Sequence, residues 1–440
     1  MEHIYFIGCG GVGFCLLEVF KLERLYYDCD FTIIEPKQEI EDLDKIMKGR
    51  KYKHIAQPLT RENYKELLKG VNSKTFIINV SVDVDSIMLL ELAKERKAWY
   101  IDTSLEQYQD FIHVPIDKIT RYSQFKQNNL FHQNLKAEEV MKDAKKTVVV
   151  SAGMNPGMIS ILAKKALVEY GKLKGKHLQK GNYAKLSYEL GLKEVQCVEY
   201  DTQQLTVKAT PDTFVNTWSS PVGIQEEATD LVMLSLNNDD IKEMTDAGIQ
   251  LIKPTEGKDT SVRFIAERGM DLTRESETLD DDGVPFKYRG YLLPHAEIIT
   301  LSEFLRYKGN SPTVMYVYRP CDEAMRSLEF LRKANYEHLP NGVVVRSKQV
   351  LSGYDSIGAL LHFKDGTRYG AWTVCGIEDT RRLKLLSNPT MLQVAGFMNA
   401  TIKWELQNTN RGLVQVEEMG HDFIFKDAQK YLGKIFFKQI

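Results

Sequence analysis

A glycine-rich turn between a short apolar run and an apolar-periodic stretch constrains the fold of this 440-residue chain more than any other feature. Gly8, Gly10 and Gly13 match the G-x-G-x-x-G pattern, the run 4–7 before them predicts a strand, and residues 14–22 predict a helix. In that context Gly8 permits the turn, Gly10 lets the backbone approach a pyrophosphate, and Gly13 allows close packing of helix on strand. The pattern predicts a dinucleotide site, and a glycine turn without a ligand is the alternative.

The residue that follows the second predicted strand indicates which dinucleotide would bind. Residues 31–34 form an apolar run that ends at Glu35. A carboxylate at this point can accept hydrogen bonds from a ribose 2′-hydroxyl, and it repels a 2′-phosphate. The sequence therefore predicts NAD as the cofactor in preference to NADP.

Continuous apolar runs keep alternating with helical patterns as far as residue 171, which is typical of a doubly wound Rossmann-type parallel sheet. Ligands of such sheets bind beyond the carboxyl ends of the strands. The residues at those predicted ends are Ser81, Val82, Asp83, Asp102, Thr103, Gly153, Met154 and Asn155. We expect these residues to line the cofactor site with the glycine turn, Gly11, Val12 and Thr60.

From about residue 155 the pattern changes, and it favours a second α+β domain with a mixed or antiparallel sheet. The strand-like runs cover residues 184–190, 195–201, 287–293, 313–319 and 342–347. Residues 254–285 are polar and charged, which predicts an irregular segment exposed to solvent. Residues 171–182 are basic and predict a surface loop. Residues 390–406 and 426–435 predict helices. We expect an NAD-binding domain at 1–153, a substrate domain at 154–385, and C-terminal helices at 386–440 that pack back near the first domain.

Net charge and cysteine content limit the partners, the compartment and the metals that we expect for this chain. The formal net charge is −2, from 58 basic and 60 acidic residues, which gives no reason to expect nucleic acid or a membrane surface. No apolar run is long enough to span a bilayer, and no signal-peptide pattern is present. The six cysteines have no zinc-ligand spacing and no disulfide framework, so we expect a cytoplasmic protein with reduced thiols and no metal.

A set of motifs resembles a known family over essentially the whole chain. The motifs are NVSVD, YIDTSLE, AGMNPGMIS, VEYDTQ, FVNTWS, LLPHAE, YRPCDEA, GYDSIG, EDTRRL and LQVAGFMNATIKWELQNTNRGLV. Their order and spacing are similar to those of the homospermidine synthases, within the saccharopine-dehydrogenase-like group. The chain departs from the family in a compact C-terminus, in Gly11 within the phosphate loop, and in Glu35 where aspartate is common.

The resemblance implies a reaction. Bound NAD⁺ takes a hydride from the carbon beside an amine of putrescine, and a second amine then displaces ammonia from the imine. The same NADH reduces the new imine to homospermidine, so the cofactor is regenerated in each turnover. Spermidine is a possible further substrate.

The resemblance also implies the roles of individual residues. The matched catalytic positions are Trp218, Glu199, Glu226, Asn155 and His295. The matched substrate-binding positions are Asp83, Glu106, Asp355 and Glu297. A diammonium substrate has to be held by carboxylates or π faces, which these residue types supply. Taken alone, the tryptophan could be a core residue, the glutamates surface carboxylates, and His295 a structural histidine. Cys321 has no identifiable base and is better explained as structural.

Two other readings compete with the synthase. A net dehydrogenase acting on saccharopine or carboxynorspermidine would need arginines for the substrate carboxylates, whereas the matched positions here are acidic. A catalytically silent NAD-sensing or scaffold protein is disfavoured because Trp218, Glu199 and Glu226 occur together. We expect a homodimer, the commonest assembly of such enzymes.

Overall fold

The computed structural model describes residues 1–108, 130–219, 230–254, 260–334 and 340–440. Six strands of the N-terminal part and one strand of the C-terminal segment form a seven-stranded sheet in the order β20-β6-β5-β4-β1-β2-β3, in which every neighbouring pair is parallel. Its strands are β1 (His3–Ile7), β2 (Asp30–Ile34), β3 (Lys51–Ile55), β4 (Thr75–Asn79), β5 (Trp99–Asp102), β6 (Val148–Val149) and β20 (Leu413–Val414). The predicted Rossmann-type sheet is confirmed.

Both faces of this sheet are covered, as the continuous apolar runs predicted. Phe6 and Ile78 point into one core together with α1 (Gly11–Leu22), whereas Tyr5 and Ile77 point into a second core with α4 (Ser86–Arg96). Alternate residues of each strand thus reach opposite faces. The other helices near this sheet are α2 (Leu43–Met47), α3 (Tyr64–Leu67) and α5 (Leu130–Val140).

The second part of the chain is built on a ten-stranded mixed sheet, which confirms the predicted α+β domain. Its main path is β11-β12-β10-β15-β7-β18-β19-β21, and β14 joins β13 to β15. The strands are β7 (Leu192–Asp201), β10 (Leu231–Ser235), β11 (Leu251–Ile252), β12 (Val262–Arg268), β13 (Thr273–Leu279), β14 (Pro285–Leu292), β15 (Thr313–Arg319), β18 (Tyr354–Phe363), β19 (Arg368–Gly376) and β21 (Lys434–Gln439). β15 and β7 pair in parallel, and the other pairs are antiparallel.

Helices and two small ribbons complete this part. The helices are α6 (Met158–Leu173), α7 (Tyr183–Leu190), α9 (Asn238–Asp246), α10 (Ala296–Phe304), α11 (Asp322–Lys333) and α12 (Ile377–Arg382). The ribbons pair β8 (Gln204–Leu205) with β17 (Val350–Ser352) and β9 (Thr213–Asn216) with β16 (Asn341–Val344). α6 packs on β18 and β19.

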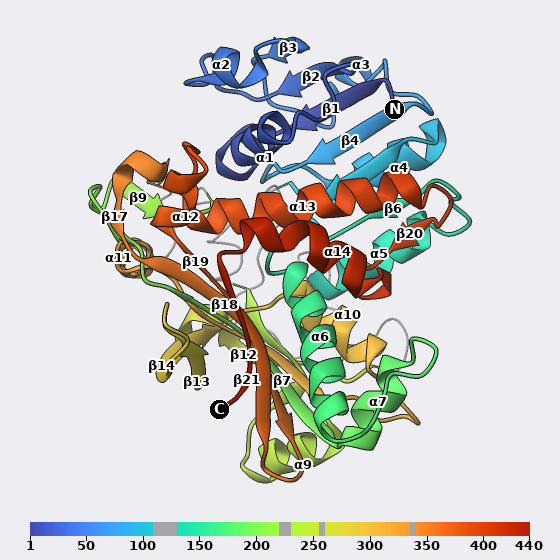
Figure 1. Cartoon of the computed structure of the whole chain (residues 1–440), viewed down its shortest axis with the longest axis vertical. Helices are drawn as coiled ribbons and strands as arrows, with labels where there is room; N and C mark the ends of the chain where they lie inside the picture. The colour runs from blue at the N-terminus through green and yellow to red at the C-terminus, as the bar shows by residue number, and fades with distance from the viewer. Residues whose placement is uncertain (109–129, 220–229, 255–259, 335–339) are drawn as a thin grey trace.

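The C-terminal segment contacts both sheets (Figure 1). Helix α13 (Pro389–Gln407) packs on α1 and also contacts β18 and β19, and α14 (His421–Ala428) follows it. β20 then adds to the first sheet and β21 to the second. We retain the boundaries 1–153, 154–385 and 386–440 as a proposal, with the last segment shared between the sheets.

Three local predictions were wrong. Residues 184–190 form helix α7 and not a strand, because Asn182 caps the helix, Gly191 ends it, and Tyr183 and Leu186 are buried at helical spacing. The stretch 254–285 contains β12 and β13, whose inward residues such as Thr278 are buried. The predicted helix at 426–435 ends early, because α14 stops at Ala428 and β21 starts at Lys434.

A tryptophan lying over two glycines makes the centre of the second sheet sensitive to added volume. Trp372 is fully buried on β19, and a Cβ placed on Gly358 or Gly370 would overlap its ring. We expect Gly358→Ala to lower the free energy of unfolding by about 1–3 kcal/mol, the usual cost of overpacking. Denaturant unfolding of the purified protein measures this. Gly420→Ala is the matched control, since a Cβ there meets no atom within 4 Å; an equal loss in both variants would contradict the packing argument.

Candidate functional site

The glycine turn has the geometry that its spacing predicted. Gly8 has a φ of +83°, and a Cβ on it would lie 2.8 Å from the backbone of Ser81. A Cβ on Gly13 would lie 2.5 Å from the carbonyl oxygen of Gly8, so this glycine brings α1 close to the strand. A Cβ on Gly10 would meet nothing within 4 Å, because the backbone there faces open space. Helix α1 begins at Gly11 and presents its N-terminus to that space.

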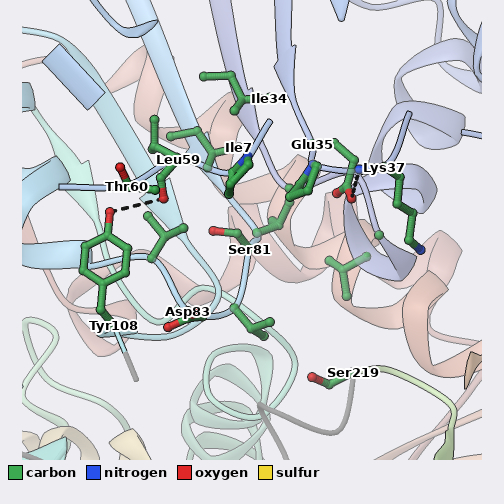
Figure 2. A pocket seen from close by; sticks show the side chains of 18 of the residues that line it. Ile7, Ile34, Glu35, Lys37, Leu59, Thr60, Ser81, Asp83, Tyr108 and Ser219 are labelled. Atoms are coloured by element: carbon green, nitrogen blue, oxygen red, sulfur yellow. Dashed lines mark hydrogen bonds between the residues drawn. The ribbon is translucent and has the colours of Figure 1, made fainter. Parts of the chain in front are cut away.

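An outer cavity of about 730 Å³ lies against this turn. Figure 2 shows Glu35 and Lys37 on one side of it, Thr60 and Tyr108 on the other, and Ser81 between them. Glu35 is 8% exposed, and its Oε2 accepts a hydrogen bond of 2.8 Å from the backbone N–H of Cys9. The carboxylate thus stands beside the glycine turn at the end of β2, where a ribose would meet it.

An inner cavity of about 120 Å³ adjoins the outer one. Both cavities are lined by Val12, Val80, Ser81, Val82, Trp218 and Ser219. The inner cavity continues between the two sheets to Glu199 on β7 and Tyr316 on β15. None of the described residues that line it is lysine or arginine. The space is therefore suited to a small cation next to the end of a bound dinucleotide.

Glu199 is held in the inner cavity by neutral donors. Its Oε2 accepts a hydrogen bond of 2.5 Å from Nδ2 of Asn155 and one of 2.7 Å from the hydroxyl of Tyr316. Burial raises the pKa of Glu199 from its ordinary value to about 7, although both hydrogen bonds oppose that change. A carboxyl with such a pKa can take up and release a proton near neutral pH.

Two further side chains of the inner cavity are oriented by hydrogen bonds to residues that lie outside it. Nδ1 of His295 lies 2.7 Å from Oε2 of the buried Glu297, to which it donates. The indole N–H of Trp218 donates a 3.0 Å hydrogen bond to the hydroxyl of Tyr318. The hydrogen bond fixes the edge of the indole, and the residue lines both cavities.

The structure brings most of the sequence-predicted site residues together. The outer cavity is lined by Gly8, Gly10, Gly11, Val12, Glu35, Thr60, Ser81, Val82 and Asp83. The inner cavity is lined by Val12, Ser81, Val82, Thr103, Glu106, Gly153, Met154, Asn155, Glu199, Trp218 and His295. Thr103, Gly153, Met154 and Asn155 thus face the inner cavity and not the outer one. Glu226 lies outside the described residues.

Four predicted residues line neither cavity, although only Gly13 was expected to act by packing. Gly13 acts through packing alone. Asp102 is fully buried, and its carboxyl accepts hydrogen bonds from the hydroxyl of Tyr100 and the backbone N–H of Ser151. Glu297 lies behind His295. Asp355 is fully buried and accepts a 2.7 Å hydrogen bond from the hydroxyl of Thr390.

Asp355 belongs to a network of buried polar groups that the sequence did not reveal. Asp201 is its cross-strand partner and is also buried. Nε2 of Gln203 donates to both Asp201 and Thr390, and Thr390 lines the inner cavity. Thr217 donates to Asp201 and directly precedes Trp218 in the chain. Burial raises the pKa of both aspartates, although the hydrogen bonds that each accepts oppose this change.

Other cavity residues were also missed. Tyr316 lines the inner cavity, and Tyr318, which bonds to Trp218, follows two residues later on β15, a strand that sequence analysis identified without assigning its tyrosines. The two-residue spacing puts both on one face, next to β7, and that spacing was a usable signal. Lys37 and Tyr108 line the outer cavity without any signal in the sequence.

The described residues offer no candidate metal site and no candidate membrane-spanning helix. They contain no group of three or more His, Cys, Asp or Glu side chains that could hold a metal ion. Across the same parts of the chain, no helix has the length and apolar character needed to cross a membrane.

Comparisons with known proteins agree with this geometry. Residues 4–150 match the family of the saccharopine dehydrogenase NADP binding domain. The homospermidine synthase of Blastochloris viridis is 28% identical, with 98% of this chain and 90% of that protein covered. The homospermidine synthase of Mesorhizobium japonicum is 27% identical, with coverage of 98% and 89%.

Two solved structures share the fold. The homospermidine synthase of Legionella pneumophila in complex with NAD has a TM-score of 0.82 at 24% identity, covering 100% of this chain and 91% of that one. Saccharopine dehydrogenase of Saccharomyces cerevisiae has a TM-score of 0.56 at 10% identity, with both chains fully covered. The chain therefore resembles the homospermidine synthases over nearly its whole length, as its motifs predicted, and its N-terminal domain matches that of the saccharopine dehydrogenases.

Proposed function

We propose that this protein is an NAD-dependent homospermidine synthase. It joins two putrescine molecules, or spermidine and putrescine, with release of ammonia. One observation carries the proposal: a small cavity with carboxylates, an indole and no described lysine or arginine opens directly onto a dinucleotide-sized cavity. The curated relatives named homospermidine synthase support the same reaction.

The outer cavity fits NAD. Gly10 and the N-terminus of α1 would hold the pyrophosphate, and Glu35 the adenosine ribose. The Legionella homospermidine synthase binds NAD, which supports this choice over the NADP in the name of the matched domain family. When bound, NAD supplies a hydride acceptor for the carbon beside the amine of putrescine, and a hydride donor for the new imine.

The residues of the inner cavity would manage charge and protons. Putrescine enters as a diammonium ion, and one amine has to lose its proton before a hydride can leave the adjacent carbon. Glu199 is buried, faces the cavity and has a raised pKa, so it is the residue that would take up this proton. Glu106, which lines the same cavity, would balance a second ammonium group.

Trp218 would stabilise the cationic intermediates. After hydride loss the substrate is an iminium ion, whose charge is delocalised and poorly shielded by water. An indole face attracts such a cation by cation–π interaction, most strongly where water is excluded. Trp218 lies at the junction of the two cavities, where the reacting carbon would meet the cofactor.

A net dehydrogenase of the saccharopine or carboxynorspermidine type is the alternative. Its substrates carry carboxylates, and bidentate arginines are the usual partners of such groups. The described lining of the inner cavity contains none, and burial of a substrate carboxylate beside Glu199 would be costly. The cavity therefore favours an amine substrate without carboxylates.

We also propose that the protein works in the cytoplasm as a homodimer. All six cysteines are buried and free, which suits a reducing compartment. Symmetric dimers are the commonest assembly of soluble enzymes.

The reaction itself gives the first test. Purified protein incubated with putrescine and NAD should form homospermidine and ammonia in equal amounts, with no net NADH. NADP should support a lower rate, because Glu35 repels the 2′-phosphate. Product chromatography, an ammonia assay and absorbance of NADH measure the three quantities. Stoichiometric accumulation of NADH would instead identify a dehydrogenase.

Substitutions of Trp218 test its role. Trp218→Phe should retain part of the activity, because it keeps a weaker π face, whereas Trp218→Ala should retain very little. NAD binding should persist in both. Steady-state kinetics and a cofactor titration measure these effects. Tyr318→Phe is the matched control, since it removes the 3.0 Å hydrogen bond but keeps the indole. Normal turnover by the alanine variant would exclude a cation–π role.

The pH dependence tests Glu199. A group that accepts a proton has to be deprotonated, so turnover should fall as the pH drops through the raised pKa of Glu199, about 7. Glu199→Gln should lower kcat by at least about a hundredfold and remove this acid limb. Glu194→Gln, on the same strand but outside both cavities, serves as the control. An unchanged acid limb in Glu199→Gln would assign the proton to another group.

A further inference from the structure

A third cavity lies behind His295, on the side away from the cofactor site. Its volume is about 10 Å³, at the lower limit for one water-sized molecule. Its polar lining comes from Ser151, Ser160, Glu297, Thr300, Gln415 and Glu417. An ammonium ion is close to water in size, so the cavity is suited to a single molecule of either kind.

Two buried polar atoms of this cavity have no hydrogen-bond partner among the residues that the structure describes. Oε1 of Glu297 is one, on a residue that is 1% exposed, and Oγ of Ser151 is the other, on a residue that is 4% exposed. Leaving a buried polar atom unpaired is costly, and an unpaired carboxylate oxygen especially so. Both residues line the same small space, which indicates that a further molecule bonds to them.

The charges around the cavity favour a cation. Glu297 and the buried Glu417 both line it, and no lysine, arginine or histidine is among the described residues of its lining. The neighbouring bases are engaged elsewhere: His295 bonds Oε2 of Glu297, and Lys164 donates to the backbone oxygens of Glu417 and Met419. Oε1 of Glu417 already accepts from Ser160 and Thr300. A bound cation would offset the charge of Glu297 at its unpaired oxygen.

The cavity is placed between the substrate site and a second opening. Pro156 lines both this cavity and the inner cavity, and His295 separates Glu297 from the inner cavity. On the other side, Thr300 and Glu417 also line a separate cavity of about 220 Å³. The lining of that cavity further includes Glu138, Glu303 and Glu418. Acidic groups thus continue outward from the small cavity and away from the cofactor.

We propose that the cavity between Glu297 and Glu417 is a binding site for one ammonium ion, and that it receives the ammonia released in the inner cavity. The second part rests on the proposed function. In that reaction the nitrogen of the incoming amine forms a new bond to the imine carbon. The old carbon–nitrogen bond breaks, its electron pair goes to the leaving nitrogen, and ammonia departs. One proton of the attacking amine passes to the leaving nitrogen to form this ammonia, and the proton that Glu199 took from putrescine converts the ammonia to ammonium.

Removal of ammonia to this side would also serve the reaction. Ammonia left beside the new imine can attack it and reverse the transfer. A site behind His295 separates the product from the reacting carbon while the cofactor still fills the outer cavity. The ion then leaves through the acidic cavity without passing the cofactor.

Thallium, a monovalent cation of similar size, provides a direct test. Crystals of the full chain soaked in a thallium salt should show an anomalous peak between Oε1 of Glu297 and Oγ of Ser151. Competition by added ammonium, but not by sodium, should remove the peak. No peak in the wild-type protein would overturn the proposal and leave a water molecule as the occupant. A peak displaced equally by sodium would overturn the preference for ammonium.

Variants separate binding from folding. Glu297→Gln should weaken thallium binding by at least about tenfold, because a buried cation loses its charged partner. Ser151→Ala removes one ligand without changing charge, so it should weaken binding less. Glu329→Gln, at an exposed position on α11 outside the described cavities, should bind as the wild type does. Equal thallium binding by Glu297→Gln and the wild type, with NAD binding intact in both, would overturn the assignment.

Turnover tests the link to the released product. Added ammonium should inhibit homospermidine formation at lower concentration in the wild type than in Ser151→Ala, whereas equal inhibition of both would overturn the role in product release. If the protein forms no homospermidine at all but still binds thallium at this position, the proposed function fails and the cation site stands.

Discussion

The burial of Glu199 with neutral hydrogen-bond donors is the constraint on which the site depends. Asn155 and Tyr316 stabilise its carboxylate, but neither brings a positive charge. A carboxylate buried in this way is either protonated or paired with a cation that enters the cavity. In the proposed reaction, a substrate ammonium group would supply the positive charge that the neighbouring donors of Glu199 lack. The buried charge of Glu199 would therefore account both for the binding of an ammonium group and for the uptake of its proton.

Helix α13 contacts elements of both sheets and thereby fixes the position of the residues around Glu199. At its start, Asn388 donates hydrogen bonds to the backbone oxygens of Thr217 and Val345, next to Trp218. Just before it, Ser387 donates to the buried Glu18 on α1. Near its end, Glu405 accepts from the backbone of Tyr100 on β5. The cavities between the sheets therefore have one wall that is anchored to both of them.

The sequence was most informative where a single physical demand dominated. Strands buried on both faces require continuous apolar runs, so the first sheet was predicted well, and the glycine turn has the backbone geometry that its spacing predicted. β13 was missed because one of its faces carries charged residues such as Glu275, which gave it the composition of a loop. α7 was mistaken for a strand because its caps were overlooked.

The sequence indicated which residues lie at or near the candidate site, but not which of them line the inner cavity. Residue types and motif positions indicated Glu199, Trp218 and His295, which do line the inner cavity. The same reasoning could not separate the residues that line it from those one layer behind, such as Asp355 and Glu297. That distinction depends on the pairing of β18 with β7 and on side chains from distant parts of the chain, including Thr390. It follows from tertiary packing, which no local pattern encodes.

The position of β20 has a consequence for how the chain is made. Six strands of the first sheet are complete by Val149, but the strand that covers the edge of β6 begins only at Leu413. During synthesis from the N-terminus, the edge of β6 has to wait for more than half of the chain to emerge. Unpaired edges of this kind are the places where partly folded chains join one another. The first domain therefore depends on the last segment both for its final strand and for protection of this edge while the second sheet forms.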